Sequence, residues 1–132
     1  MRWHGEHQFT SDISHQSDAE AWKHFRCKYP GYASEMRNVH LGLCTDGFNL
    51  FGKGGRKYSL SPVIVTPYNI PPAFCMKREF LFLAILVPYP NHPRRALDVF
   101  LKPLIPELQM LWHEGVRVYD VSLKTNFMMR AV

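Results

Sequence analysis

The sequence contains no apolar run long enough to cross a bilayer and no secretory leader. Its longest uninterrupted apolar run, FLFLAILV at residues 80–87, has eight residues, whereas a membrane-spanning helix needs about 20. The N-terminal stretch MRWHGEHQFTSD has neither an apolar segment nor a small-residue cleavage site. We therefore expect an intracellular protein with no membrane partner.

Cysteine is also scarce, and the common catalytic signatures are missing. Cys27, Cys44 and Cys75 are odd in number, widely spaced and without a CxxC pair, which argues against a disulfide framework and a four-ligand zinc site. The GKGGRK turn at 52–57 does not have the spacing of a phosphate-binding P-loop. There is no GxSxG or HExxH motif. Nucleotide binding by a P-loop, serine hydrolysis and zinc proteolysis are thus disfavoured.

What the chain does have is enough apolar material for one domain and a segment rich in positive charge. It has 132 residues, 46% of them hydrophobic, and a net charge of +5. Both ends are neutral, and the surplus lies at 52–102, where only Glu79 and Asp98 oppose eight basic residues: Lys53, Arg56, Lys57, Lys77, Arg78, Arg94, Arg95 and Lys102. Such a segment suits a polyanion such as nucleic acid. An ordinary solvated basic face is the alternative.

Hydrophobic periodicity predicts an α/β arrangement that begins with a helix. Ser17 and Glu20 have capping-box spacing and predict a helix at about 18–28. Strands are then expected at 39–45, 58–65, 80–87 and 116–121, with a long helix between the last two. The unbroken apolar run 80–87 is typical of a central strand buried on both faces.

The long helix carries apolar residues at spacings of three and four from Leu97 to Trp112, with Gly115 as its C-cap. Pro103 predicts that the regular helix begins only there, after a looser lead-in at 97–102, because proline is tolerated in a first turn but not in a helix interior. The aromatic residues Trp22, Trp112, Tyr29 and Tyr32 are interpreted as packing residues in preference to base-stacking ones, whereas Tyr68 and Tyr89 on the basic loops could stack on bases.

Asp46 is the leading candidate for chemistry. If the first three strands form an antiparallel meander, the turn at 46–57 and the loop at 88–96 lie at one end of the sheet. That end would gather Asp46 with five cations: Lys53, Arg56, Lys57, Arg94 and Arg95. Asp46 before Gly47 is first of all a common turn dipeptide; the functional interpretation is a carboxylate that holds a divalent cation against a phosphodiester. Asp120, which also ends a strand, is the other local candidate.

Several motifs, taken in order, resemble the transposases of plant CACTA-type (En/Spm) DNA transposons. They include RNVHLGLCTDGFNLFG, SPVIVTPYNIPPAFCMK, LKPLIPELQMLWHEGV and YDVS. The resemblance implies a ribonuclease H-like core of the DDE class, which cuts and rejoins transposon ends in the nucleus with Mg²⁺ or Mn²⁺. Asp46 matches the first catalytic aspartate of that family.

The resemblance also predicts an incomplete catalytic core. Residues 1–38 are expected to be an N-terminal helical segment, and residues 39–132 the first part of a ribonuclease H-like domain, ending before the family's second and third acids. We expect a fragment that does not cut DNA or bind metal tightly alone, with transposon-end DNA and other transposase copies as partners. The alternatives are a non-catalytic remnant that uses the basic loops on nucleic acid or protein, and a chain that does not fold stably.

Overall fold

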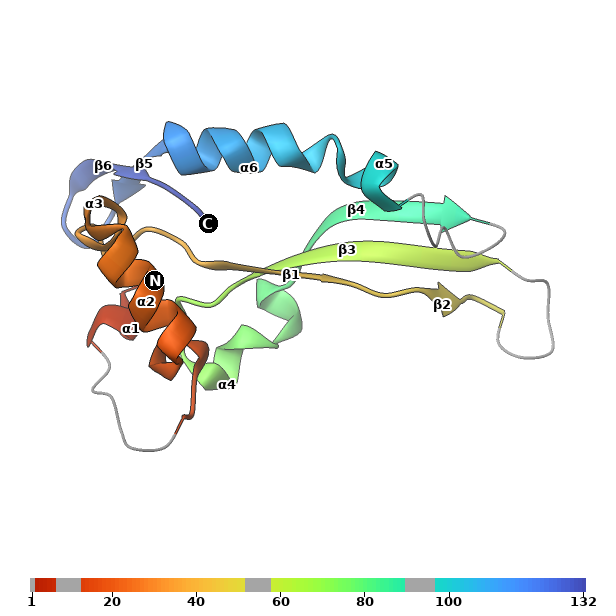
Figure 1. Ribbon diagram of the computed structural model, residues 1–132, viewed down its shortest axis with the longest axis horizontal. Helices are drawn as coiled ribbons and strands as arrows, with labels where there is room; N and C mark the ends of the chain where they lie inside the picture. The colour runs from red at the N-terminus through yellow and green to blue at the C-terminus, as the bar shows by residue number, and fades with distance from the viewer. Residues whose placement is uncertain (1, 7–12, 52–57, 90–96) are drawn as a thin grey trace.

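The computed structural model describes residues 2–6, 13–51, 58–89 and 97–132. A long sheet runs the length of the molecule, with α6 along one face and the N-terminal helices and a small hairpin at one end (Figure 1). The helical elements are α1 (Trp3–Glu6), η1 (Gln16–Asp18), α2 (Glu20–Lys28), α3 (Pro30–Ala33), α4 (Pro72–Cys75), η3 (Arg78–Phe80), α5 (Leu97–Leu101) and α6 (Leu104–His113). The strands are β1 (Leu41–Thr45), β2 (Phe48–Asn49), β3 (Ser59–Pro67), β4 (Phe82–Tyr89), β5 (Val116–Asp120) and β6 (Thr125–Met129).

The larger sheet is the expected antiparallel meander, with β3 at its centre. β1 and then β2 pair with one edge of β3, from Leu41 opposite Pro67 to Asn49 opposite Ser59. The pairing lapses at Asp46 and Gly47, across from Pro62, which has no N–H to donate to a ladder. The α/β class with antiparallel sheets is confirmed.

The prediction that 80–87 forms a central strand is wrong, because β4 pairs only with β3 among the described strands. Val87 is fully buried, whereas Phe82 and Leu83 are 56% and 59% exposed. The register of β4 shifts between Val63 and Ile64 of β3, so that Ala84 is an extra, bulged residue. An unbroken apolar run therefore occurs here on an edge strand.

The long helix is divided as its prolines predict. α5 ends at Leu101, and α6 begins after Pro103. Pro106 falls in the first turn of α6, where its missing N–H breaks no helical bond. Gly115 follows with a positive φ of 75°, and its amide donates to the Met110 carbonyl at 3.0 Å, which confirms the C-cap.

The N-terminal helices are held by buried polar groups rather than by the expected cap. The capping box is formed by His15 and Asp18 on η1, and Ala19, which precedes α2, makes no side-chain cap, so the Ser17–Glu20 prediction is wrong. Ser17 is instead engaged by His15, because its amide donates to the ring Nδ1 at 3.1 Å. The division of the chain at residue 38 stays a prediction.

The chain ends beside the start of β1. After the β5–β6 hairpin, the segment 130–132 runs parallel to 39–41, with a bridge between Val39 and Ala131. The Val39 amide donates to the Arg130 carbonyl at 2.8 Å, and the Val132 amide donates to the Val39 carbonyl at 3.0 Å. No helix in the part of the chain described is long and apolar enough to span a membrane.

Candidate functional site

Asp46 lies immediately after β1, in the gap between β1 and β2, as the sequence predicts. Its side chain is exposed, and its Oδ1 accepts a hydrogen bond from the Gly47 amide at 2.7 Å. The second carboxylate oxygen has no partner among the residues the structure describes. A carboxylate in this position is accessible to solvent and to a ligand that approaches the strand end.

The described residues alone do not make a two-metal site around Asp46. Nowhere in residues 2–6, 13–51, 58–89 and 97–132 do three or more His, Cys, Asp or Glu side chains gather as metal ligands would. Two-metal phosphoryl transfer requires several such ligands, which hold two metal ions about 4 Å apart. Asp46 can therefore contribute one ligand, and the remaining ligands would have to come from elsewhere.

The predicted basic residues around Asp46 fall outside the described part of the chain. These are Lys53, Arg56 and Lys57 in one segment and Arg94 and Arg95 in the other. What the structure does give is the strand ends from which these segments depart: Asn49 is opposite Ser59, which is opposite Tyr89. These strand ends lie at the same end of the sheet.

Among the residues that the structure describes, the outer edge of β1 is paired only at its start. Segment 130–132 accompanies residues 39–41, and beyond it an apolar groove of about 370 Å³ lies between the sheet and α6. The groove is lined by Leu41 and Leu43 of β1, by Leu108 and Trp112 of α6, and by Val132. The edge of β1 that leads to Asp46 is therefore flanked by apolar surface.

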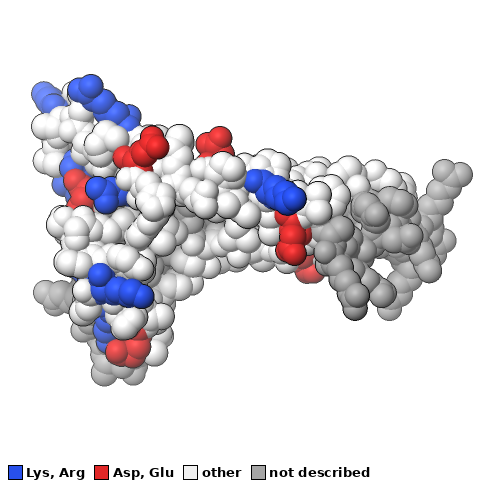
Figure 2. Space-filling view, turned by 45° about the horizontal axis from the view of Figure 1, so that its top comes forward, with Lys and Arg blue, Asp and Glu red and all other residues white. Residues whose placement is uncertain are grey.

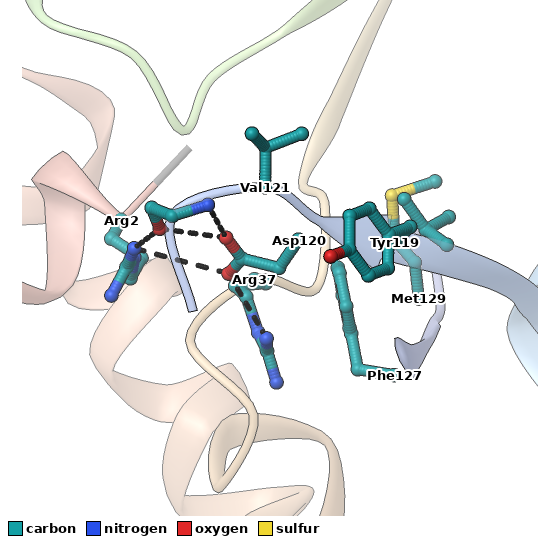
Figure 3. Close-up of a pocket in the computed structure, with 9 residues that line it drawn as sticks. Arg2, Arg37, Tyr119, Asp120, Val121, Phe127 and Met129 are labelled. Atoms are coloured by element: carbon teal, nitrogen blue, oxygen red, sulfur yellow. Dashed lines mark hydrogen bonds and ion pairs between the residues drawn. The ribbon is translucent and has the colours of Figure 1, made fainter. Parts of the chain in front are cut away.

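Asp120, the other candidate acid, belongs to an ion-pair cluster at the tip of the β5–β6 hairpin (Figure 3). Arg37 Nη1 donates to its Oδ2 at 3.1 Å, and the Ser122 amide donates to its Oδ1 at 2.9 Å. Arg2 Nη2 lies 3.8 Å from its Oδ2 and also bonds the Ser122 hydroxyl. The hydrogen bonds from Ser122 and Arg37 hold the pKa of Asp120 well below its usual range.

This cluster fastens the N-terminal segment to the hairpin and leaves the Asp120 carboxylate fully engaged. Arg37 is further held by Glu35, whose Oε1 accepts from Nε at 2.7 Å, and it lies 3.7 Å from the centre of the Phe127 ring. Sequence reasoning missed the role of Arg2 and Arg37, because no local pattern links residues so far apart. Asp120 does not share a site with Asp46.

Fold and site together describe an α/β protein with a single exposed acid at the end of its first sheet strand. The chain belongs to a family of transposases: the model of the transposase family tnp2 matches residues 10–132. No curated protein and no solved structure matches the chain significantly.

Proposed function

We propose that this transposase chain is part of the catalytic region of a DDE-type enzyme related to plant CACTA (En/Spm) elements. Its core would be ribonuclease H-like, and Asp46 would be the first of its metal-binding acids. DNA with transposon ends would be the substrate, in the nucleus, and further transposase copies would complete the assembly.

The observation that carries this proposal is the arrangement around β1. The strand pairs with antiparallel β3, its first residue also bonds to the segment 130–132, which runs parallel to 39–41, and it is followed by an exposed aspartate. A strand that continued in the register of Val39 with Ala131 would run along β1 toward Asp46, beside the apolar groove. A second acid on such a strand would come to the side of Asp46.

The described residues supply one ligand, so the chain by itself would bind DNA without cutting it. Magnesium or manganese, when bound by the complete set of acids, would supply the Lewis acid for phosphodiester chemistry. The contribution of this chain is the position of the Asp46 carboxylate, whose Oδ1 is oriented by the Gly47 amide.

The first test is the sequence of the transcript. If its reading frame continues past Val132, the seventh residue after Ala131 would face Asp46, because Asp46 is the seventh after Val39. We expect an aspartate at that position or beside it. A continuing frame that forms a strand there without an acid would contradict the DDE assignment.

A second test addresses the metal directly. Paramagnetic Mn²⁺ is added to ¹⁵N-labelled protein, and we expect weak binding that broadens the amide signals of Gly47 and its neighbours first. Asp46→Asn should abolish this effect while leaving the free energy of unfolding within about 0.5 kcal/mol of the wild type, because the side chain is exposed. Broadening centred elsewhere, or unchanged in Asp46→Asn, would remove Asp46 from the metal site.

A further inference from the structure

A cleft of about 360 Å³ lies between the junction of α2 with α3 and the last turn of α6. Its volume is at the lower end of the range for small-ligand pockets, about 300–1,000 Å³. It is lined by basic and aromatic side chains and by one glycine: Lys28, Tyr29, Gly31, Trp112, His113 and Arg130. None of the described residues that line it is an aspartate or a glutamate.

The two permanent cations of the cleft are not neutralised. Neither Lys28 nor Arg130 forms an ion pair with any residue in the described ranges, whereas Lys23 and Arg37 are each paired with a glutamate. Lys and Arg side chains gather at this end of the molecule, interspersed with Asp and Glu side chains, whereas the long middle carries few charges (Figure 2). Lys28 also complements the C-terminus of α2, but Arg130 lies on no helix. The cleft is therefore positive and open to an anion.

Its aromatic wall is made of rings that pack against one another. The Tyr32 ring is stacked on Trp112, with centroids 5.4 Å apart and planes at 27°, and the Tyr32 hydroxyl donates to the Val39 carbonyl at 2.7 Å. Tyr29 meets Trp112 edge to face at 5.2 Å and is 37% exposed. Burial raises the pKa of Tyr32, and Arg130, which lines the same cleft, lowers it. Lys28 Nζ lies over the Tyr29 ring, 5.6 Å from its centre, so Tyr29 offers a partly exposed ring in a cleft with two cations.

We propose that this cleft binds an unpaired nucleotide of a DNA strand, with Lys28 and Arg130 contacting phosphate and Tyr29 stacking on the base. An unpaired nucleotide presents both a charged backbone and a free aromatic face, which is the combination that single-strand sites use. A duplex hides the faces of its bases. The choice of DNA over RNA rests on the proposed function.

The cleft is distant from Asp46. Asp46 follows Val39 by seven residues of extended chain, roughly 20 Å away, so variants of the cleft leave Asp46 intact.

The test compares the binding of fluorescein-labelled oligo(dT) and of a hairpin duplex, measured by fluorescence anisotropy. In the double variant Lys28→Gln/Arg130→Gln, we expect affinity for oligo(dT) to fall by about tenfold or more. The slope of log K against log salt should fall by about 1.4, since each phosphate contact on a single strand contributes about 0.7. The control Lys77→Gln/Lys102→Gln removes the same charge outside the cleft and should change oligo(dT) affinity by about twofold at most.

Gly31 provides a variant without a charge change. Gly31 lines the cleft, and a Cβ there would meet no heavy atom within 4 Å, so Gly31→Leu adds an apolar side chain at the cleft from a position with open space. We expect it to weaken oligo(dT) binding and to leave thermal unfolding unchanged, and Tyr29→Leu should likewise weaken binding by removing the stacking ring.

Three outcomes would overturn the proposal. If the cleft variants bind oligo(dT) like the wild type, the cleft is not the site, while DNA binding by the chain stands. If they lose oligo(dT) and duplex equally, the cations contact phosphate without selecting unpaired bases. If the wild type binds neither DNA, this proposal and the proposed function both fail.

Discussion

Arg37 and Asp120 lie 83 positions apart in the chain, and the Arg37 guanidinium donates to the Asp120 carboxylate at 3.1 Å. The contact joins the segment before β1 to the tip of the β5–β6 hairpin. Because Ser122 and Arg2 engage the same carboxylate, the hairpin is held at its far end as well as by its strand pairing.

This contact predicts that the free energy of unfolding decreases at acid pH. Hydrogen bonds from Ser122 and Arg37 lower the pKa of Asp120 in the folded state. The ionised carboxylate therefore contributes fully to stability above its unfolded-state pKa of about 4, and this contribution is lost as pH falls toward the folded-state pKa. Asp120→Asn should lower the Tm near neutral pH, and the difference from the wild type should shrink as pH falls below about 4. Glu107→Gln, on the exposed face of α6, is the matched control. A difference in Tm that does not change with pH would contradict the ionic origin.

Asn69 should be among the most sensitive positions in the chain. It is fully buried; its Oδ1 accepts from the His40 amide at 2.6 Å, and its Nδ2 donates to the Asn38 carbonyl at 2.7 Å. Asn69→Ala leaves these buried groups without partners, so we expect the free energy of unfolding to fall by about 3 kcal/mol in urea titrations. Asn126→Ala, on exposed β6, should cost well under half as much. Equal costs would show that the Asn69 hydrogen bonds are not decisive.

His40 predicts a second loss of stability on acidification, at higher pH than that of Asp120. Burial, the neighbouring His4 and Arg26 lower its pKa to about 4. The unfolded chain therefore takes up the proton first, and stability falls as pH drops from about 6.5 to about 4. After a discount for the exposed part of the ring, the loss should be about 2 kcal/mol.

The variant His40→Phe retains a ring for the stack on Trp22, whose centroid lies 3.7 Å away. Urea unfolding near pH 7 and near pH 5 should show a smaller loss for this variant than for the wild type. If both proteins lose the same stability, His40 is not the titrating group.

The two glycines at helix ends should respond in opposite ways to alanine. Gly115 has a φ of 75°, and a Cβ there would lie 2.7 Å from the Met129 carbonyl oxygen. Gly115→Ala should therefore destabilise the chain by about 2 kcal/mol, from left-handed strain and a backbone clash. Gly31→Ala meets open space and should be neutral or slightly stabilising. Thermal unfolding of the pair checks both, and similar Tm values would refute the expectation for Gly115.

Patterns that act over a few residues predicted much of the fold. The meander, the break before Pro103 and the cap at Gly115 depend on local periodicity and on backbone chemistry, which the sequence displays directly. The placement of 80–87 failed for a different reason. Periodicity indicates how apolar a strand is. The order of strands in the sheet, in which β3 lies between β1 and β4, decides which strand lies at the edge.

The site was predictable only in part. The position of Asp46 at the end of β1 follows from the strand pattern and is confirmed, whereas its metal role stays a prediction. The cap of η1 was missed because His15 is not a usual capping residue. Tyr29 was interpreted as a packing residue. Its sequence neighbours do not predict the cleft that it lines, because Trp112 and Arg130 of the same cleft come from the other end of the chain.

The bulge at Ala84 bears on how the chain behaves at high concentration. β4 carries the most apolar segment of the sequence along a sheet edge, an arrangement that commonly recruits a strand from another molecule and seeds fibrils. The extra residue at Ala84 breaks the even row of backbone donors and acceptors, and Pro88 removes one donor near its end. A strand from another molecule can form regular backbone hydrogen bonds only with the few residues between Ala84 and Pro88. The bulge and the proline therefore limit intermolecular pairing at the most apolar segment of the chain.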